Sequence, residues 1–281
     1  MHGPSHSDRG GRPADHPGLV TAVIGDLIYE SWYLGLRTLR RFYRVPANWI
    51  GIIVFPLIQL FVFSQLFKDI IQLPGFRAGG NGSYLAYLAP GQIAFTAFFA
   101  VAWSGSSILV EYRNGYMDKL RATPIRRVSI LFGELAPLFL ESAVMAGGIL
   151  ALSIVLGATI KTGIVGAAMI LVLSGLFGMA WAGTSFVPAF LTKSEQATGT
   201  LSLLFFPIAF MSTAFVPPAL MPGWLQTVNA WNPITFLIEA IRPLMVSGYD
   251  WGAIGKALLA LAILGTVLQS ATLWAFRRLT A

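Results

Sequence analysis

The sequence predicts an all-α integral membrane protein with six transmembrane helices, an N-terminal amphipathic interfacial helix, and re-entrant half-helices between spans five and six. The first observation is composition: of 281 residues, 56% are hydrophobic and only 11% are charged, whereas a soluble domain carries about 25% charged residues. The second is the recurrence of apolar runs of about 20 residues, enough to cross a hydrocarbon core of about 30 Å. The third is that Lys and Arg flank these runs, as the positive-inside rule requires.

Composition and motifs exclude several classes of site. The chain has no Cys, and its three His lie at positions 2, 6 and 16, so neither a disulfide nor a buried His/Cys metal site is expected. The net charge of +7 does not indicate a nucleic-acid partner, because the cations flank spans and face anionic headgroups. No Walker A, nucleophile-elbow or zinc-protease motif occurs, so no enzyme activity is expected of this chain.

The N-terminal region is expected to contain a tail followed by one helix. Residues 1–18 are rich in Gly, Pro, His and Ser and are expected to be disordered. Residues 19–45 are expected to form an amphipathic helix in the membrane interface, with Leu36 and Leu39 on its apolar stripe. Four arginines at i, i+3, i+4 and i+7 share its polar face: Arg37, Arg40, Arg41 and Arg44. The alternative is a soluble amphipathic helix packed on a partner.

The six spans are expected at residues 49–67, 88–110, 131–156, 164–191, 199–215 and 253–276. With the N-terminus inside, only five of the 19 Lys and Arg fall on outer segments: Lys68, Arg77, Lys161, Arg242 and Lys256. This asymmetry favours a multi-pass protein of the cell membrane with both termini in the cytoplasm. Small residues recur in span three at Ala143, Gly147 and Ala151, and in span four at Ser174, Gly178 and Ala182, which predicts close helix packing.

A charged island, EYRNGYMDKLRATPIRR, joins spans two and three at residues 111–127. Its seven charged residues are Glu111, Arg113, Asp118, Lys119, Arg121, Arg126 and Arg127. Five of them are cations, which places the island on the cytoplasmic side. One interpretation is a solvated loop that only sets topology. The other is a docking helix that receives force from a soluble partner.

Residues 217–251 do not fit a plain outer loop. Five prolines divide the segment: Pro217, Pro218, Pro222, Pro233 and Pro243. Leu220–Val228 and Ile234–Val246 are too short to span and too apolar for water, which predicts half-helices that dip into the outer leaflet. A loop resting on the membrane is the alternative. Glu239 and Arg242, at i, i+3 spacing, are expected to pair or to line an exit route.

Glu134 and Glu141 are the acids inside a predicted span, on one face of it because they are seven residues apart. An acid within the membrane is costly and suggests function by default. The functional interpretations are a proton relay or a contact for a cationic substrate. The structural interpretation is a protonated or hydrogen-bonded acid that faces another helix.

Taken in order, these features resemble a membrane-spanning subunit of a type-2 ABC exporter, the permease group that covers daunorubicin-resistance, nodulation-factor and polysaccharide exporters. The resemblance covers about residues 20–278 and rests on three features. The N-terminal amphipathic helix is one, and the motif NPITFLIEAIRPLM, Asn232–Met245, behind a Pro-rich segment is another. The island supplies the third, through Glu111, Arg113, Gly115, Leu120, Ala122, Pro124 and Arg126.

The resemblance implies a division of labour between subunits. Two permeases, identical or homologous, would pair in the membrane, and each would dock a separate ATPase subunit that holds ATP and Mg²⁺. The island would be the coupling helix, with Asp118, Lys119, Arg121 and Arg127 among its contacts. Residues 19–45 would be the connecting helix, and the segment with Asn232 and Pro233 a re-entrant cap.

The function implied is export of an amphipathic or hydrophobic substrate, such as a drug, lipid or glycolipid, from the cytoplasm or the inner leaflet. No cofactor is expected in this chain itself. The main rival is a proton-coupled secondary transporter that uses Glu141. A structural membrane protein without cargo is a third class.

Overall fold

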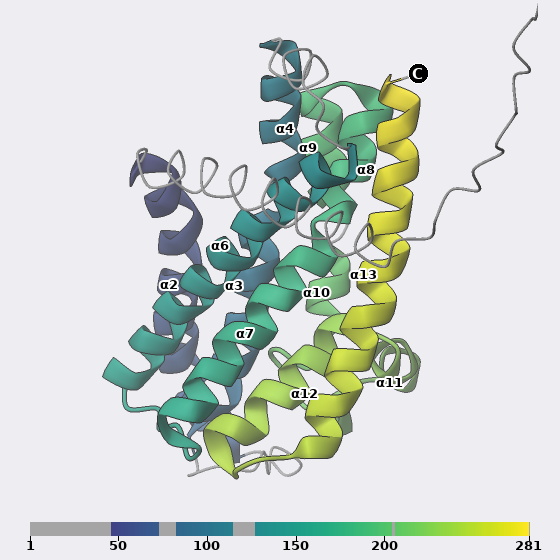
Figure 1. The fold of residues 1–281 in the computed structure, drawn as a ribbon. Coiled ribbons are helices and arrows are strands. Elements are labelled where there is room, and N and C mark those ends of the chain that lie inside the picture. The colour runs from purple at the N-terminus through teal and green to yellow at the C-terminus, as the bar shows by residue number, and fades with distance from the viewer. Residues whose placement is uncertain (1–45, 73–82, 115–126, 204–205, 281) are drawn as a thin grey trace, which may run out of the picture.

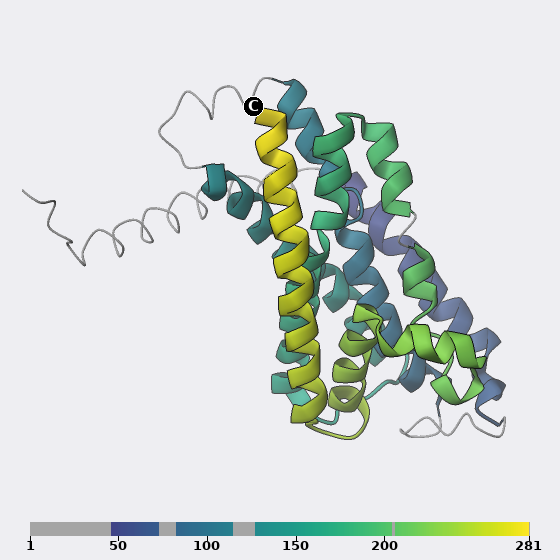
Figure 2. The same cartoon turned by 90° about the vertical axis from the view of Figure 1, so that its right-hand side faces the viewer.

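The computed structural model describes residues 46–72, 83–114, 127–203 and 206–280, and these ranges are helical. Figures 1 and 2 show an elongated bundle in which α13 runs along the whole length of the molecule. The predicted tail and the predicted interfacial helix, residues 1–18 and 19–45, lie outside the described residues. The structure therefore does not test the arrangement of Arg37, Arg40, Arg41 and Arg44.

The described helices follow one another along the chain as α2 Pro46–Leu66, η1 Lys68–Gln72, α3 Tyr84–Val101, α4 Ser104–Arg113, α6 Arg127–Val155, α7 Gly163–Trp181, α8 Gly183–Thr192, α9 Glu195–Leu203, α10 Phe206–Phe210, η2 Pro218–Leu220, α11 Gly223–Ala230, α12 Pro233–Val246 and α13 Trp251–Thr280.

Four stretches of the described chain are long and apolar enough to cross a membrane: Tyr84–Val110, Gly133–Val155, Gly163–Thr192 and Trp251–Arg278. They coincide with predicted spans two, three, four and six. Helix α2 occupies predicted span one, and Ile53–Leu66 is the apolar part of it that the structure describes fully. Four of the six predicted spans are therefore candidate membrane spans by their length and composition.

Predicted span five, residues 199–215, is helical only as far as Phe210 in the described chain. It contains the end of α9, described to Leu203, and α10 Phe206–Phe210, and residues 204–205 between them lie outside the described residues. The helix ends there because the Ser212 hydroxyl donates to Ala209 O at 2.6 Å and its backbone N–H donates to the same oxygen. Such local bonds compete with helix continuation.

Span two begins earlier than predicted. Tyr84 and Tyr87, expected in the outer loop, lie in the first turn of α3 and are only 3% exposed. Burial is possible because both hydroxyls find carbonyl partners. Tyr87 Oη donates to Thr213 O at 2.9 Å, and Tyr84 Oη donates to Phe215 O at 3.4 Å. The start of α3 is thereby joined to the segment that follows α10.

Helix α3 is the centre of the bundle, since it packs against α2, α6, α7 and α12 and almost all of its residues are buried. Its Phe95 and Phe98 lie edge to face with Phe206 of α10, with ring centroids 5.8 and 5.5 Å apart. The predicted close packing of spans three and four is confirmed at Gly178, where an added Cβ would overlap Ser142 of α6.

Helix α12 begins at the Asn-Pro motif. The Asn232 side chain accepts from Ile234 N at 2.9 Å and so caps the helix, and Pro233 occupies the first turn, where its missing N–H is harmless. Asn232 Nδ2 also donates to Ile208 O at 2.6 Å. The two helices predicted between residues 217 and 251 are present as α11 and α12, and their entry into a leaflet remains a prediction.

Candidate functional site

One end of the molecule holds α4, the helix that leads into the charged island, together with helices from later in the chain. Helices α4, α8 and α9 lie there beside the C-terminal end of α13 (Figure 1). Helix α4 packs against both α8 and α9, and its last residue, Arg113, precedes the island segment 115–126. A force applied to that segment would therefore reach the bundle through α4 on one side and through α6, which begins at Arg127, on the other.

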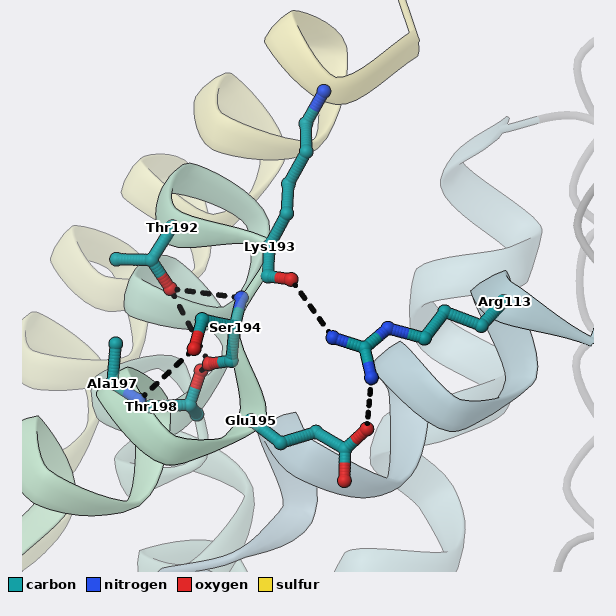
Figure 3. Close-up of polar contacts among 7 residues, drawn as sticks. All are labelled: Arg113, Thr192, Lys193, Ser194, Glu195, Ala197 and Thr198. Carbon is teal, nitrogen blue, oxygen red and sulfur yellow. Dashed lines mark hydrogen bonds and ion pairs between the residues drawn. The ribbon is translucent and has the colours of Figure 1, made fainter.

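The turn between α8 and α9 is held in one shape by its own polar groups (Figure 3). Lys193 ends α8 with a left-handed φ of 53°, the usual way to end a helix. Ser194 then accepts from Ala197 N at 3.3 Å and so caps α9. Ser194 O accepts from Thr198 Oγ1 at 2.7 Å, and Ser194 N donates to Thr192 Oγ1 at 3.3 Å.

Arg113 connects α4 to this turn through two contacts (Figure 3). Its Nη1 donates to Glu195 Oε1 at 2.8 Å, and its Nη2 donates to the Lys193 carbonyl at 3.2 Å. The side chains of Arg113 and Glu195 are 56% and 41% exposed. An exposed ion pair contributes only about 0.2–1 kcal/mol to stability. Its consequence is positional, since it fixes the end of α4 against α8 and α9.

A second link joins α4 to α8 where both long helices are broken. Helix α3 stops at Val101 and α4 starts at Ser104, while α7 stops at Trp181 and α8 starts at Gly183. Ser185 Oγ accepts from Gly105 N and donates to Ala102 O, each at 2.9 Å. Because the first N–H groups and last carbonyls of a helix lack internal partners, this one hydroxyl satisfies both sides of the break.

Only part of the predicted coupling set falls in described elements. Glu111 and Arg113 lie in α4, and Arg127 is the first residue of α6. The other members lie outside the described residues: Gly115, Asp118, Lys119, Leu120, Arg121, Pro124 and Arg126. The sequence reasoning did not single out Glu195. The signal for it was the Ser194-Glu195 pair at the start of a polar stretch, which is typical of a helix N-terminus.

The remaining predicted residues lie on other helices, α6 and α12, or at the start of α12. Glu134 and Glu141 are both half-buried on α6. In the part of the chain that the structure describes, Glu239 and Arg242 do not form the expected ion pair. Instead, Arg242 Nη2 donates to Thr213 O at 2.8 Å and its guanidinium lies 4.2 Å above the Tyr87 ring. Glu239, on the neighbouring turn, is exposed.

Comparison with known proteins identifies the family to which this architecture belongs. The family model described as ABC-2 type transporter matches residues 29–246. The daunorubicin resistance ABC transporter permease protein DrrB1 of Streptomyces coeruleorubidus is 28% identical over 270 residues, covering 95% of this chain and 91% of the relative.

Two further relatives are more distant or shorter matches. The probable doxorubicin resistance ABC transporter permease protein DrrC of Mycobacterium tuberculosis is 23% identical, covering 75% of each chain. Nodulation protein J of Rhizobium leguminosarum bv. trifolii is 28% identical, covering 66% of this chain and 74% of the relative. Since the family model covers well over half of the residues, the chain belongs to the ABC-2 type transporter family and is a membrane permease of that family.

Proposed function

We propose that the chain is the permease subunit of an ATP-driven exporter, and that its island docks a separate ATPase. The observation that carries this proposal is the Arg113 contact with Glu195 and the Lys193 carbonyl, directly beside the segment where an ATPase would bind. A movement of residues 115–126 would be passed through α4 to the α8–α9 turn at once. ATP and Mg²⁺ would be held by the partner subunit.

The mechanism is a biased equilibrium between two arrangements of the helices. ATP binding can favour one arrangement only if the ATPase contacts the two arrangements differently. The island is the place where that difference enters, and the Arg113 contact stiffens its connection to the bundle. Two such permeases, each with its ATPase, would form the complete exporter, with both termini of each permease in the cytoplasm.

The proposed cargo is an amphipathic or hydrophobic molecule. Support comes from the relatives, two of which are named for resistance to daunorubicin and doxorubicin and one as a nodulation protein. It is tested by adding doxorubicin, a glycolipid or a polar sugar to the reconstituted complex and measuring ATP hydrolysis. Stimulation by the first or second, and not by the sugar, is the expected result.

Co-purification tests the docking proposal. The tagged chain is extracted in mild detergent beside the variant Asp118→Ala/Arg121→Ala/Arg126→Ala, and a Walker A-containing subunit is sought by mass spectrometry. The native chain is expected to retain this subunit and the variant to lose it. A matched control, Lys68→Ala/Asp69→Ala/Lys161→Ala, removes one acid and two cations at exposed positions in the expected outer segments and should retain it. Absence of any ATPase from intact native complexes would reject the assignment.

The proton-coupled alternative predicts a different energy source for transport and a required role for Glu141. If protons drive transport through this acid, Glu141→Gln abolishes transport, and a proton gradient alone supports transport by the native chain. If ATP drives it, transport by the native complex requires ATP and persists without a gradient.

A further inference from the structure

Helix α12 turns back into α13 at one end of the molecule (Figures 1 and 2). A cavity of about 450 Å³ is lined by residues of these two helices and of the turn between them. Ser247 and Asp250 line it from the connecting turn, and Lys256 lines it from α13. Pockets for small ligands commonly measure about 300–1,000 Å³. The cavity is separate from the site described above, since the α4 and α9 ends lie at the opposite end of the molecule (Figure 1).

Both signs of charge line this cavity. Its charged residues are two acids and two bases, namely Glu239, Asp250, Arg242 and Lys256. Its apolar wall includes Phe236, Pro243 and Val246. A purely anionic or purely cationic ligand would lie close to side chains of its own charge, and this repulsion would weaken its binding. The lining therefore favours a ligand that is itself zwitterionic and partly apolar.

Two of the four charged groups already form hydrogen bonds within the protein. Arg242 is already bonded to Thr213 O, and Asp250 Oδ1 accepts from Ala253 N at 2.9 Å. Glu239 and Lys256 are exposed, and within the described ranges neither forms a hydrogen bond or an ion pair. Glu239 and Lys256 can therefore bond a ligand directly, while Arg242 keeps an Nε without a hydrogen-bond partner among the described residues and Asp250 keeps its second carboxylate oxygen.

Neighbouring side chains place the cavity at the level of lipid headgroups. Tyr249 and Trp251 stack at 5.6 Å between centroids beside the cavity and are 44% and 68% exposed. Exposed aromatic residues of this kind mark a membrane interface. Farther along α13, Leu258, Leu259 and Ile263 are 42%, 63% and 58% exposed, as expected of a surface that faces acyl chains. Lys256 lies between these two zones.

We propose that this cavity binds the headgroup of a phospholipid that carries both a phosphate and a primary ammonium. Lys256 would contact the phosphate, with Arg242 adding positive potential, and the Glu239 carboxylate would accept from the ammonium N–H groups. The acyl chains would follow the exposed apolar surface of α13. The proposal holds for either membrane face, because both leaflets present headgroups, and it does not depend on the export function.

Native mass spectrometry of the full chain in detergent tests the proposal with three lipids of identical acyl chains. Phosphatidylethanolamine is expected to bind about tenfold more tightly than phosphatidylcholine, which has no ammonium N–H, or phosphatidylglycerol, which has no cation. Glu239→Gln/Lys256→Gln should remove this preference. The matched control Asp69→Asn/Lys161→Gln makes the same changes of charge at exposed positions and should keep it. Circular dichroism and gel filtration establish that both variants are folded.

Three results would overturn the proposal. The native chain could retain the three lipids equally, the Glu239→Gln/Lys256→Gln variant could keep the preference, or that variant could lose all three lipids alike through general loss of packing. Phosphoethanolamine without acyl chains distinguishes a lipid from a soluble ligand. If it displaces the lipid at equal concentration, the cavity belongs to a soluble phosphoamine and the lipid assignment is wrong. None of these measurements needs an ATPase, so their failure leaves the export proposal intact.

Discussion

Glycine allows backbone contact at the centre of the bundle. Gly91 of α3 faces residue 214, and an added Cβ would come within 2.5 Å of Ala214 O and 2.6 Å of Ala214 Cα. These are backbone atoms and cannot rotate away as a flexible side chain can. The segment after α10 is also held there by Tyr87 and Arg242, which both donate to Thr213 O. Close approach and hydrogen bonding therefore support each other at this point.

Gly91→Ala is expected to destabilise the protein by about 1–3 kcal/mol, because overpacking must move backbone. Gly255→Ala on α13, where an added Cβ meets nothing within 4 Å, is the control. It should be neutral or stabilising by up to about 1 kcal/mol, since Ala favours a helix over Gly. Thermal unfolding in one detergent measures both. Equal midpoints for the two variants would contradict the backbone contact.

At the scale of elements, the sequence predicts the continuous helices well and the broken ones poorly. Spans three, four and six were placed within a few residues, because long apolar runs leave few alternatives. The break at Ala102–Trp103 was not predicted, although the small and polar residues Ser104–Ser107 follow it directly. It depends on Ser185, which is 80 residues away from Gly105 and closes the break from α8.

The candidate site was also predictable only in part, because its contacts join residues that are distant in the sequence. Arg113 could be assigned to the island from its local charge pattern. Its partners Glu195 and the Lys193 carbonyl come from a different loop, and a sequence pattern does not show which distant charge lies opposite. Likewise Arg242 was expected to pair with Glu239 on its own helix, but burial beside Thr213 and Tyr87 gives it a carbonyl and an aromatic face instead.

Ser185→Ala should loosen the junction between α4 and α8, because Gly105 N and Ala102 O both lose their partner. Leaving buried polar groups unsatisfied costs about 1–3 kcal/mol. Ser153→Ala is the matched control, since Ser153 is equally buried but its hydroxyl donates only to Ile149 O of its own helix. Hydrogen exchange should quicken in α4 in the first variant alone. Unchanged exchange in α4 would show that Ser185 does not hold the break.

At the scale of the whole molecule, the two ends of the bundle differ in the contacts that hold their helices together. Opposite to α4, the turn between α6 and α7 is bonded to α12. Thr162 Oγ1 donates to Leu244 O at 2.7 Å, and Lys161 N donates to Met245 O at 3.0 Å. These contacts use backbone acceptors. The α4 end also uses backbone acceptors, at Ala102 and Lys193, but it adds an exposed ion pair, which is weaker and sensitive to salt. The contact that Arg113 makes is therefore the easier one to move.

The last prediction concerns the ion pair between Arg113 and Glu195, whose acidic and basic residues should be exchangeable. Arg113→Glu or Glu195→Arg alone places like charges together and should reduce substrate-stimulated ATP hydrolysis by the complete exporter about two- to fivefold, the size expected of an exposed pair. The double variant Arg113→Glu/Glu195→Arg should recover most of the loss, because opposite charges again face each other. Arg278→Glu is the control. Arg278 is an exposed cation near the same end, and its guanidinium lies 4.2 Å above the Trp274 ring. Any defect of this variant should not be rescued by Glu195→Arg.

Salt separates an electrostatic effect of these substitutions from a structural one. At 1 M salt the screening length is about 3 Å, so the defect of each single variant should shrink toward the native value. Glu195→Arg leaves the Arg113 donor to the Lys193 carbonyl in place, so a defect of this variant that persists at high salt would mean that the contact between Arg113 and Glu195 does not transmit the motion. In that case the Lys193 carbonyl and the Ser185 junction would be left as the connection between α4 and the rest of the bundle.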